Sequence, residues 1–261
     1  MTLKITDVVS FIKKLHVKLN KNNKNYNKTD NKFKTKKDFQ IDPVTKFDLD
    51  TEKLIRKEIN IRYKNHNIVG EEFNKQLHGS EYTWYIDPID GTKSLIMGLP
   101  NWSNLIGLYK KKECILSYAN FPLLNKYYLS YGSNTYLINK GIKKKIKCNK
   151  NVKVQNSKLI INTLHCLREK KVLDYIMSYK GFFKVTGADS LNFCSIAEGK
   201  FDVMIESGLK IVDIYPLKLI VKNSGAIMTD WNGKNIFDKG RVLISPNKKV
   251  HNYYLKLLSK L

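Results

Sequence analysis

Residues 84–98 read WYIDPIDGTKSLIMG, and this stretch decides both the fold and the chemistry expected of the chain. Its aromatic and β-branched start predicts a buried strand, the segment DPIDG at 87–91 ends that strand in a proline-fixed turn, and the remainder can form a short helix. Asp87 and Asp90 therefore leave one strand end together, with the carbonyl of Ile89 between them. An all-oxygen set of this kind suits Mg²⁺.

The predicted helix after this turn begins at Gly91 and Thr92. Its first backbone N–H groups have no partner within the helix, so they would face the same spot and can hold a phosphate. A metal site and a phosphate site would then adjoin. The alternative is an ordinary Asp-Pro turn with an Asx cap, which many α/β proteins contain, and the motif taken alone favours this alternative.

The composition describes a protein with a packed core. The chain has 261 residues and is 42% hydrophobic, enough for one large α/β domain or two small ones. No apolar run approaches the ~18 residues that span a bilayer, and the first twenty residues have no signal-peptide core, so we expect a cytoplasmic protein without a membrane partner. The four cysteines form no C-x-x-C pair, which argues against a zinc site or a disulfide framework.

The formal net charge of +24 raises nucleic acid as a partner. However, lysine is scattered along the whole chain, whereas arginine, which base and phosphate readout usually employs, is scarce. It stands at positions 56, 62, 168 and 241. We therefore do not expect nucleic acid as a partner, although a positive surface would draw phosphorylated substrates inward.

The first hundred residues outside the central stretch predict two helices and a polar loop. Apolar residues at a helical period predict an amphipathic helix over 3–19. The Lys- and Asn-rich stretch 21–37 predicts a mobile loop that can act as a lid. A second helix runs to about Arg62 with Asp48 at its start, where capping is the commonest role. A short buried strand then places Glu71 at another strand end.

The remainder predicts antiparallel strands followed by alternating strands and helices. The lysine-rich segment 141–153 is expected to be a surface hairpin or linker where two halves of the fold meet. Glu206 and Asp213 follow a strand and precede a helix whose first turn accommodates Pro216. Asp213 is either the cap of that helix or an active-site group, and the spacing leaves both alternatives open.

Four separated segments, in this order along the chain, resemble the motifs of the inositol-monophosphatase-like family. They are DPVTKFDLDTE at 42–52, GEE at 70–72, WYIDPIDGTKSLIMGLP at 84–100 and ESGLKIVDIYPLKLIVKNSGAIMTDW at 206–231. Within the family, Lys93, Gly98 and the GLK at 208–210 are most similar to the histidinol-phosphatase branch. The resemblance implies an α/β fold, a layered αβαβα sandwich forming one catalytic phosphatase domain over 1–261, and a homodimer.

The resemblance also implies Mg²⁺ as the cofactor, in two or three ions. The implied metal ligands are Glu71, Asp87, the Ile89 carbonyl, Asp90 and Asp213. Asp48 would lie near a weaker additional ion, and Thr92 would act with Asp48 and Glu71 to orient the attacking water. Gly91, Thr92, Lys93 and Asp213 would contact the substrate. Cations can neutralise phosphate oxygens, lower the pKa of a water and steady the leaving alkoxide, so no covalent nucleophile is required.

Four positions depart from the family pattern without touching these ligands. Val212, Pro216, Ala226 and Leu95 replace residues that are common in the family. We expect these changes to affect substrate shape and rate more than the type of reaction.

Two acids bear on the substrate. Glu206 resembles a family ligand for the leaving group, and Asp189, within Gly187-Ala188-Asp189, is similar to an acidic position of histidinol phosphatases. Two carboxylates would suit the ammonium and imidazole of L-histidinol phosphate, an intermediate of histidine biosynthesis. The alternative for Asp189 is a helix cap. Other activities left open are inositol-1-monophosphatase, 3′-phosphonucleotide phosphatase and, from another class, an RNA- or transcription-associated binding protein.

Overall fold

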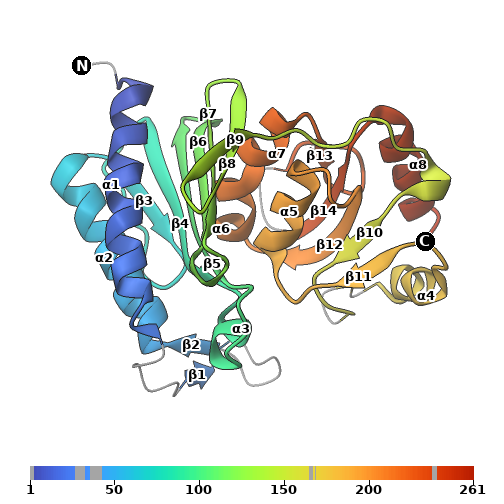
Figure 1. Cartoon of the computed structure of the whole chain (residues 1–261), viewed down its shortest axis with the longest axis horizontal. Coiled ribbons are helices and arrows are strands. Elements are labelled where there is room, and N and C mark those ends of the chain that lie inside the picture. Colours follow the sequence, from blue (N-terminus) through green and yellow to red (C-terminus); the bar gives the residue numbers. More distant parts are fainter. Residues whose placement is uncertain (1–2, 27–32, 36–42, 165–166, 168, 237–239) are drawn as a thin grey trace.

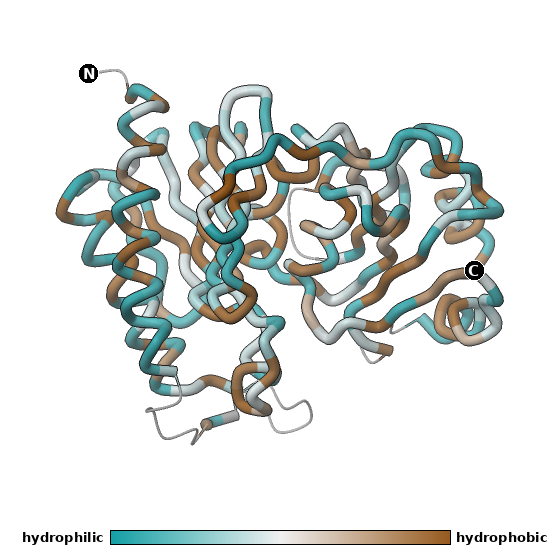
Figure 2. The backbone as a smooth tube through the Cα atoms, viewed as in Figure 1, coloured by the Kyte–Doolittle hydropathy of each residue, from teal (hydrophilic) through white to brown (hydrophobic). Residues whose placement is uncertain are grey.

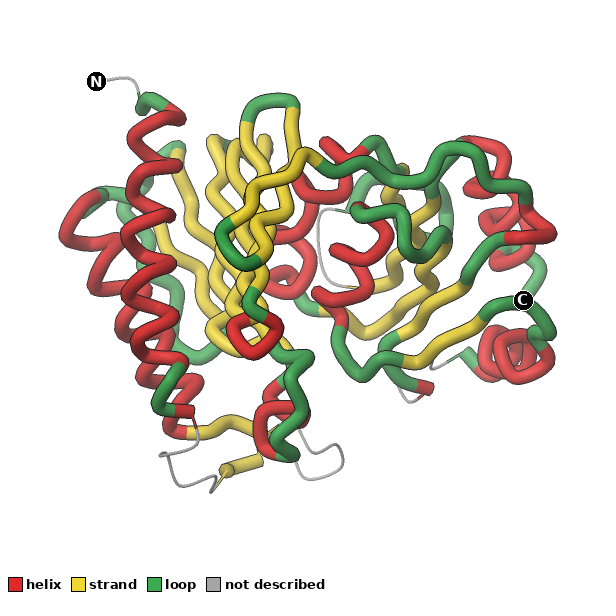
Figure 3. The backbone as a smooth tube through the Cα atoms, in the orientation of Figure 1, coloured by secondary structure: helices red, strands yellow, loops and turns green. Residues whose placement is uncertain are grey.

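The computed structural model describes residues 3–26, 33–35, 43–164, 167, 169–236 and 240–261. Its helices and two large sheets alternate in five layers, so the expected αβαβα sandwich is confirmed (Figure 1). Helices α1 and α2 form the first layer, a seven-stranded sheet the second, helices α5 to α7 the third, a five-stranded sheet the fourth and helices α4 and α8 the fifth. In Figure 3 the two sheets are the separate yellow blocks of strands, with helices between them.

The first layer covers one face of the seven-stranded sheet. Helix α1 (Ile5–Asn23) turns an apolar stripe inward, including the buried side chains of Val8, Ile12 and Leu15. Helix α2 (Lys46–Arg62) adds Ile55 and Ile59 to the same cluster. Residues at this helical spacing lie on one face of a helix, which explains the burial. Burial of such side chains contributes roughly 1.5–3 kcal/mol each, so these residues hold α1 and α2 against the seven-stranded sheet.

The seven-stranded sheet is antiparallel except for its first pair, β3 and β4. Its order follows the sequence from β3 to β9. The strands are β3 (Asn67–Gly70), β4 (Tyr82–Asp90), β5 (Ser103–Lys110), β6 (Glu113–Phe121), β7 (Lys126–Tyr131), β8 (Asn134–Asn139) and β9 (Ile142–Lys145). Strand β5 is buried along all but its last residue, because both faces of the sheet are covered, and brown hydrophobic stretches lie in this sheet as well as on the helices in Figure 2.

The second sheet has the order β11-β10-β12-β14-β13 and mixes parallel with antiparallel pairs. The elements of this half are β10 (Leu159–Ile161), α4 (Lys170–Ser178), β11 (Phe183–Val185), α5 (Asp189–Ala197), β12 (Val203–Leu209), α6 (Ile211–Ile214), α7 (Lys218–Ser224), β13 (Ile227–Thr229), β14 (Gly240–Ser245) and α8 (Lys248–Leu258). The apolar core between the sheets contains residues of both halves, such as Leu105 and Phe193. Helices α4 and α8 cover the outer face through Val172 and Tyr254.

Two local expectations were wrong. The strand that contains Trp84 does not end before Asp87 but continues to Asp90. The helix expected through Asn223 is broken into α6, a 3₁₀ turn at 215–217 and α7, because Pro216 lacks the N–H that would continue the α-helical bonds. The surface hairpin expected at 141–153 is present at its start, where the exposed strand β9 pairs with β8 at the edge of the first sheet.

The stretch 21–37, expected to be a lid, is only partly described. Helix α1 continues through Asn23, beyond the predicted end at residue 19, and residues Phe33–Thr35 form strand β1 against β2 (Pro43–Thr45). Residues 27–32 and 36–42 lie outside the described part of the chain. The lid therefore stays a prediction.

Candidate active site

Strand pairing places Glu71 beside Asp87. Strands β3 and β4 run parallel with Gly70 opposite Ile86, so the residues that follow both partners emerge at the same edge of the sheet. A Cβ on Gly70 would overlap the carboxyl group of Glu52, which is held by Arg56 and by the Glu72 N–H and would have to move. The buried strand therefore delivers Glu71 directly to the end of β4.

A β-bulge brings Asp87 and Asp90 to one side. Residues three apart on a regular strand point to opposite faces. Here Asp87 pairs with Leu105 and Asp90 with Ser103, so three steps on β4 oppose two on β5. The extra residue reverses the alternation. The bulge, rather than an end of the strand, makes the two carboxylates available to one site.

Three carboxylates form a potential metal-binding cluster. Oxygens of Glu71, Asp87 and Asp213 all lie within 4.8 Å of one another. Burial, together with the charges of Glu71, Asp90 and Asp213, raises the pKa of Asp87 well above its ordinary value. Burial and the Glu71 charge likewise raise the pKa of Asp213 to about 8. Mutual repulsion of this kind is relieved by a bound cation.

The short helix α6 presents Asp213. The carboxylate lies three residues after Lys210 and accepts a hydrogen bond of 2.7 Å from the Lys210 N–H. Asp213 thus helps to cap its helix and also belongs to the carboxylate cluster, so the two alternatives left open by the sequence coexist. The Lys210 ammonium lies 2.8 Å from Glu71 Oε1 and places one positive charge beside the cluster.

Asp90 is held from the second half of the chain. Its Oδ2 accepts a hydrogen bond from the Ser190 N–H at 3.1 Å and a second from the Ser190 hydroxyl. Ser190 Oγ in turn lies 2.8 Å from Ser103 Oγ. Burial raises the pKa of Asp90, while both Ser190 bonds oppose that rise. The first turn of α5 therefore fixes the orientation of Asp90.

Asp48 joins the start of α2 to the central motif. It completes a capping box with Thr45, accepting a 2.9 Å hydrogen bond from the Thr45 N–H and another from the Thr45 hydroxyl. Its other oxygen lies 2.9 Å from the Thr92 hydroxyl, which is also 3.2 Å from the Ile89 carbonyl. Asp48 thus caps its helix and still contacts Thr92.

Gly91 and Lys93 complete the central motif. Gly91 has φ 88° and is the N-cap of helix α3 (Thr92–Ile96), a left-handed conformation that favours glycine. A Cβ there would also approach Trp102 Cα at 3.4 Å. Lys93 is exposed on α3. Substrate contacts at Gly91, Thr92 and Lys93 remain predictions.

Asn162 connects the two acids expected to recognise the substrate. Its N–H donates to Glu206 Oε2 at 2.7 Å, and its side-chain amide donates to Asp189 Oδ2 at 2.7 Å. Glu206 lies within β12, and the N-cap of α5 is Ala188, so Asp189 is not the cap residue. Burial raises the pKa of Glu206 to about 8. Burial and the Glu206 charge raise the pKa of Asp189 well above its ordinary value.

The four departures from the family pattern are packing positions. Val212, Leu95, Pro216 and Ala226 are all buried. Leu95 packs with Phe47, Ile89 and Trp102 directly beneath the central motif. The Pro216 backbone lies against Gly107, where an added Cβ would come within 2.9 Å of Pro216 Cα. These replacements therefore alter the core that supports the site.

The donor set fits a hard divalent cation. Asp87 Oδ1 is buried and, among the described residues, has no hydrogen-bond donor, so it is available as a ligand. Carboxylate and carbonyl oxygens are the ligands that Mg²⁺ prefers. Glu71, Asp87 and Asp213 would hold such an ion, with Asp90 and the Ile89 carbonyl on the same β4 segment. When bound, a divalent cation supplies charge neutralisation and activation of water.

Sequence reasoning missed three residues that position these groups. Ser190 orients Asp90, Thr45 orients Asp48, and Asn162 joins Asp189 to Glu206. Asn162 had a usable signal, since it is a polar residue directly after the buried strand β10. That strand is parallel to β12, so their ends meet. Ser190 and Thr45 carry no comparable signal, because serine and threonine near helix starts are common.

A sequence profile of the inositol monophosphatase family matches residues 6–261. A fructose-1,6-bisphosphatase/inositol-1-monophosphatase from Aquifex aeolicus is 31% identical over 235 residues, covering 87% of this chain and 84% of the relative. The chain belongs to the inositol monophosphatase family. It is thus a member of a family of metal-dependent phosphatases, and the resemblance drawn from its motifs is confirmed.

Other members of this family carry different names. A histidinol-phosphatase from Chlorobaculum parvum is 27% identical, with 78% of this chain and 79% of the relative covered. A protein named Nus factor SuhB from Haemophilus influenzae is 25% identical, with 90% and 89% covered. The solved structure of a Thermotoga maritima inositol monophosphatase matches with a TM-score of 0.84 and 25% identity, covering 97% of each chain. Proteins named for several different activities therefore belong to this family.

Among the described helices, none has the length and apolar character needed to cross a membrane.

Proposed function

We propose that this protein is a Mg²⁺-dependent phosphomonoesterase, with one catalytic domain over residues 1–261. The observation that carries the proposal is the convergence of Glu71, Asp87 and Asp213 within 4.8 Å, from three separate elements of the chain. Mutually repelling buried carboxylates are costly unless a cation or protons compensate them. A metal site with adjoining phosphate-binding groups suits hydrolysis of a phosphate ester by water.

Different residues bind the metal, orient the water and bind the phosphate. Glu71, Asp87, Asp90, Asp213 and the Ile89 carbonyl hold the metal, in two or three ions. Thr92, held by Asp48 at 2.9 Å, orients the attacking water together with Glu71. The backbone at Gly91 and Thr92 receives the phosphate, and Lys93 adds positive charge at the mouth of the site.

The pair Asp189 and Glu206 supports a cationic leaving group. Both carboxylates bind the same residue, Asn162, and burial raises both pKa values, with the charge of Glu206 adding to the rise at Asp189. An ammonium or imidazolium group would neutralise the pair and stabilise its charged form. L-Histidinol phosphate carries such groups, so we propose it as the substrate. Inositol 1-phosphate and 3′-phosphonucleotides, whose leaving groups carry no positive charge on an amine, are the alternatives.

The substrate proposal is tested by replacing Asp189 with asparagine, which keeps the shape and removes the charge. For L-histidinol phosphate, kcat/KM should fall roughly 10- to 100-fold, the value of a charge-assisted contact of about 1.5–3 kcal/mol. For inositol 1-phosphate it should change little. Asp202→Asn is the matched control, because Asp202 is also buried and accepts a hydrogen bond of 2.9 Å from the Lys158 N–H.

Equal losses on both esters, or a wild-type preference for inositol 1-phosphate, would remove the histidinol proposal and leave the phosphatase. A role in RNA or transcription is the competing function, which the SuhB relative and the charge of +24 favour. Salt-sensitive retention of RNA without turnover of any phosphate ester would favour it over our proposal. The homodimer and the cytoplasmic location stay predictions.

A further inference from the structure

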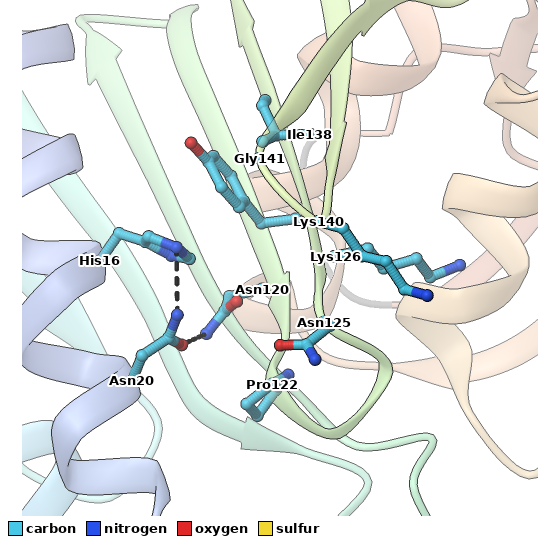
Figure 4. Close-up of a pocket in the computed structure, with 10 residues that line it drawn as sticks. His16, Asn20, Asn120, Pro122, Asn125, Lys126, Ile138, Lys140 and Gly141 are labelled. Atoms are coloured by element: carbon cyan, nitrogen blue, oxygen red, sulfur yellow. Dashed lines mark hydrogen bonds between the residues drawn. The ribbon is translucent and has the colours of Figure 1, made fainter.

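A polar cavity of about 490 Å³ lies between α1 and the strands β6 to β8, outside the carboxylate cluster. His16 and Asn20 face it from α1, and Asn120 faces it from the end of β6 (Figure 4). The remaining lining residues come from the segments around β7 and β8: Pro122, Asn125, Lys126, Tyr127, Ile138, Lys140 and Gly141. Its volume lies within the range of small-molecule sites.

The side of the cavity toward α1 is electrically neutral. Asn20 donates its amide to His16 Nε2 at 3.1 Å, so this ring nitrogen is the acceptor and the proton resides on Nδ1, 2.8 Å from the Tyr118 hydroxyl. Burial lowers the pKa of His16, in agreement with a neutral ring. The lining contains no carboxylate. This surface therefore offers hydrogen bonds without a net charge.

The two lysines direct their ammonium groups away from this surface. Lys126 Nζ lies 3.7 Å from Glu198 Oε1, a carboxylate that also pairs with Lys200 at 2.7 Å. Figure 4 shows the side chains of Lys126 and Lys140 running away from His16 and Asn20. An anion in the cavity would instead meet the amide oxygen of Asn120, which accepts hydrogen bonds and repels negative charge, because both N–H groups of Asn120 already donate to Asn20 and Asn104.

We propose that this cavity binds a small neutral polyhydroxylated molecule, of the sugar or cyclitol class. A hydroxyl group both donates and accepts hydrogen bonds, which matches the amide C=O and NH₂ of Asn125 together with the amide oxygen of Asn120. The NH₂ of Asn120 already donates to Asn20 and Asn104. Pro122, Tyr127 and Ile138 supply apolar walls for the C–H faces of such a ring. No feature of the carboxylate cluster is needed for this binding.

A buried chain of amides connects the cavity with the metal-binding segment. Asn120 donates to Asn20 Oδ1 and to Asn104 Oδ1, each at 3.0 Å. Asn104 then donates to the carbonyl of Pro88, between the two aspartates of the bulge, at 2.8 Å. Asn23 also donates to Asn104 at 2.8 Å. A ligand that orders Asn20 and Asn120 would thereby steady the backbone that carries Asp87 and Asp90.

The binding test uses myo-inositol and D-glucose as probes, with sodium phosphate for comparison, in isothermal titration of the full chain in EDTA. Without metal, binding at the carboxylate cluster does not obscure the result. At least one polyol should bind with a Kd in the millimolar range, about −4 kcal/mol, and phosphate should not compete. No heat from either polyol at about 10 mM, or competition by phosphate, would overturn the proposal.

Asn125 provides the matched variants. It has φ 53°, so Asn125→Gly removes the amide without backbone strain, and Asn125→Asp keeps the shape but loses the donor. Both should weaken polyol binding roughly 10-fold or more. Lys111→Gly is the control, since Lys111 has φ 55° in the turn between β5 and β6, away from the cavity. Wild-type affinity in both Asn125 variants would also overturn the proposal.

The connection to the metal segment rests on the proposed function and has its own readout. A polyol concentration that saturates the wild type should tighten its Kd for Mg²⁺ by about 2- to 5-fold, and Mg²⁺ should tighten polyol binding by the same factor. At that polyol concentration the effect should be smaller in Asn125→Gly, because less of the variant has polyol bound. An unchanged Kd for Mg²⁺ would overturn the connection. Absence of Mg²⁺ binding altogether would instead contradict the proposed function.

Discussion

Replacing Ser190 with alanine should weaken Mg²⁺ binding without removing any residue proposed as a metal ligand. Ser190 gives Asp90 two hydrogen bonds, one from its N–H at 3.1 Å and one from its hydroxyl. Alanine keeps the backbone bond and deletes the hydroxyl. Asp90 then loses the group that fixes its orientation, and its pKa rises further because the hydroxyl favours the charged carboxylate.

The size of the effect follows from the charge of the acceptor. A hydrogen bond to a charged group contributes about 1.5–3 kcal/mol. Since about 1.4 kcal/mol corresponds to a factor of ten, the Kd for Mg²⁺ should rise roughly 10- to 100-fold. The variant should also lose about 1 kcal/mol of folding free energy, because Ser103 Oγ loses its partner at 2.8 Å.

Isothermal titration with Mg²⁺ at pH 7.5 and at pH 9 separates orientation from protonation. If the variant binds Mg²⁺ more weakly only because the pKa of Asp90 is raised, its Kd should return to the wild-type value at pH 9. If Asp90 has lost its orientation, the Kd should remain raised at both pH values. Ser94→Ala is the matched control, since Ser94 is buried nearby and donates to the Gly187 carbonyl at 3.3 Å. Wild-type Mg²⁺ affinity in folded Ser190→Ala, or an equal loss in Ser94→Ala, would refute the reasoning.

Three further changes probe the site and its supports. Asp213→Asn should lower kcat by several orders of magnitude, while circular dichroism should show that the fold is retained. EDTA should lower the kcat of the wild type in the same way. Full activity in either case would remove the metal assignment. Thr45→Val should lower Tm by about 2–4 °C, because the capping box is worth about 1 kcal/mol. Burial raises the pKa of Glu206 from 4.5 to about 8. The folded state therefore holds this proton more tightly than the unfolded state, so the contribution of Glu206 to the stability of the metal-free protein should be greatest below pH 4.5. Between pH 4.5 and pH 8 the free energy of unfolding should fall by at most about 1.4 kcal/mol per pH unit. Glu206→Gln should flatten that slope in urea unfolding, and an unchanged slope would exclude Glu206 as its source.

Much of the fold follows from local patterns in the sequence. Residues within one element set the apolar stripe of α1, the succession of strands and short turns from β5 to β7, and the end of α7 at Gly225. Gly225, with φ 91°, ends its helix because the left-handed conformation favours glycine. Errors arose where a neighbouring element decides the outcome. Strand β4 continues to Asp90 because β5 pairs with it across the bulge, which β4 alone does not reveal.

The candidate site divides in the same way. Glu71 follows β3 and Asp87 lies on the neighbouring strand β4, so their proximity is predictable from strand order, whereas Asp90 joins them through the bulge. The contacts of Ser190 with Asp90 and of Asn162 with Asp189 join residues 100 and 27 positions apart. Such pairs depend on how the two sheets pack against the central helices. Spacing along the chain therefore could not choose between a cap and a functional group at Asp48 or Asp213.

The origin of each acidic group explains why the site forms only in the complete fold. Strands β3 and β4 bring Glu71, Asp87 and Asp90 from the first sheet, whereas α6 brings Asp213 from the second half. These like charges repel one another, so their approach must be held by packing elsewhere. The close contact of Gly107 on β5 with Pro216, three residues after Asp213, provides such packing. A side chain at position 107 would push β5 away from Pro216. A substitution of Gly107 should therefore weaken metal binding even though Gly107 contributes no ligand.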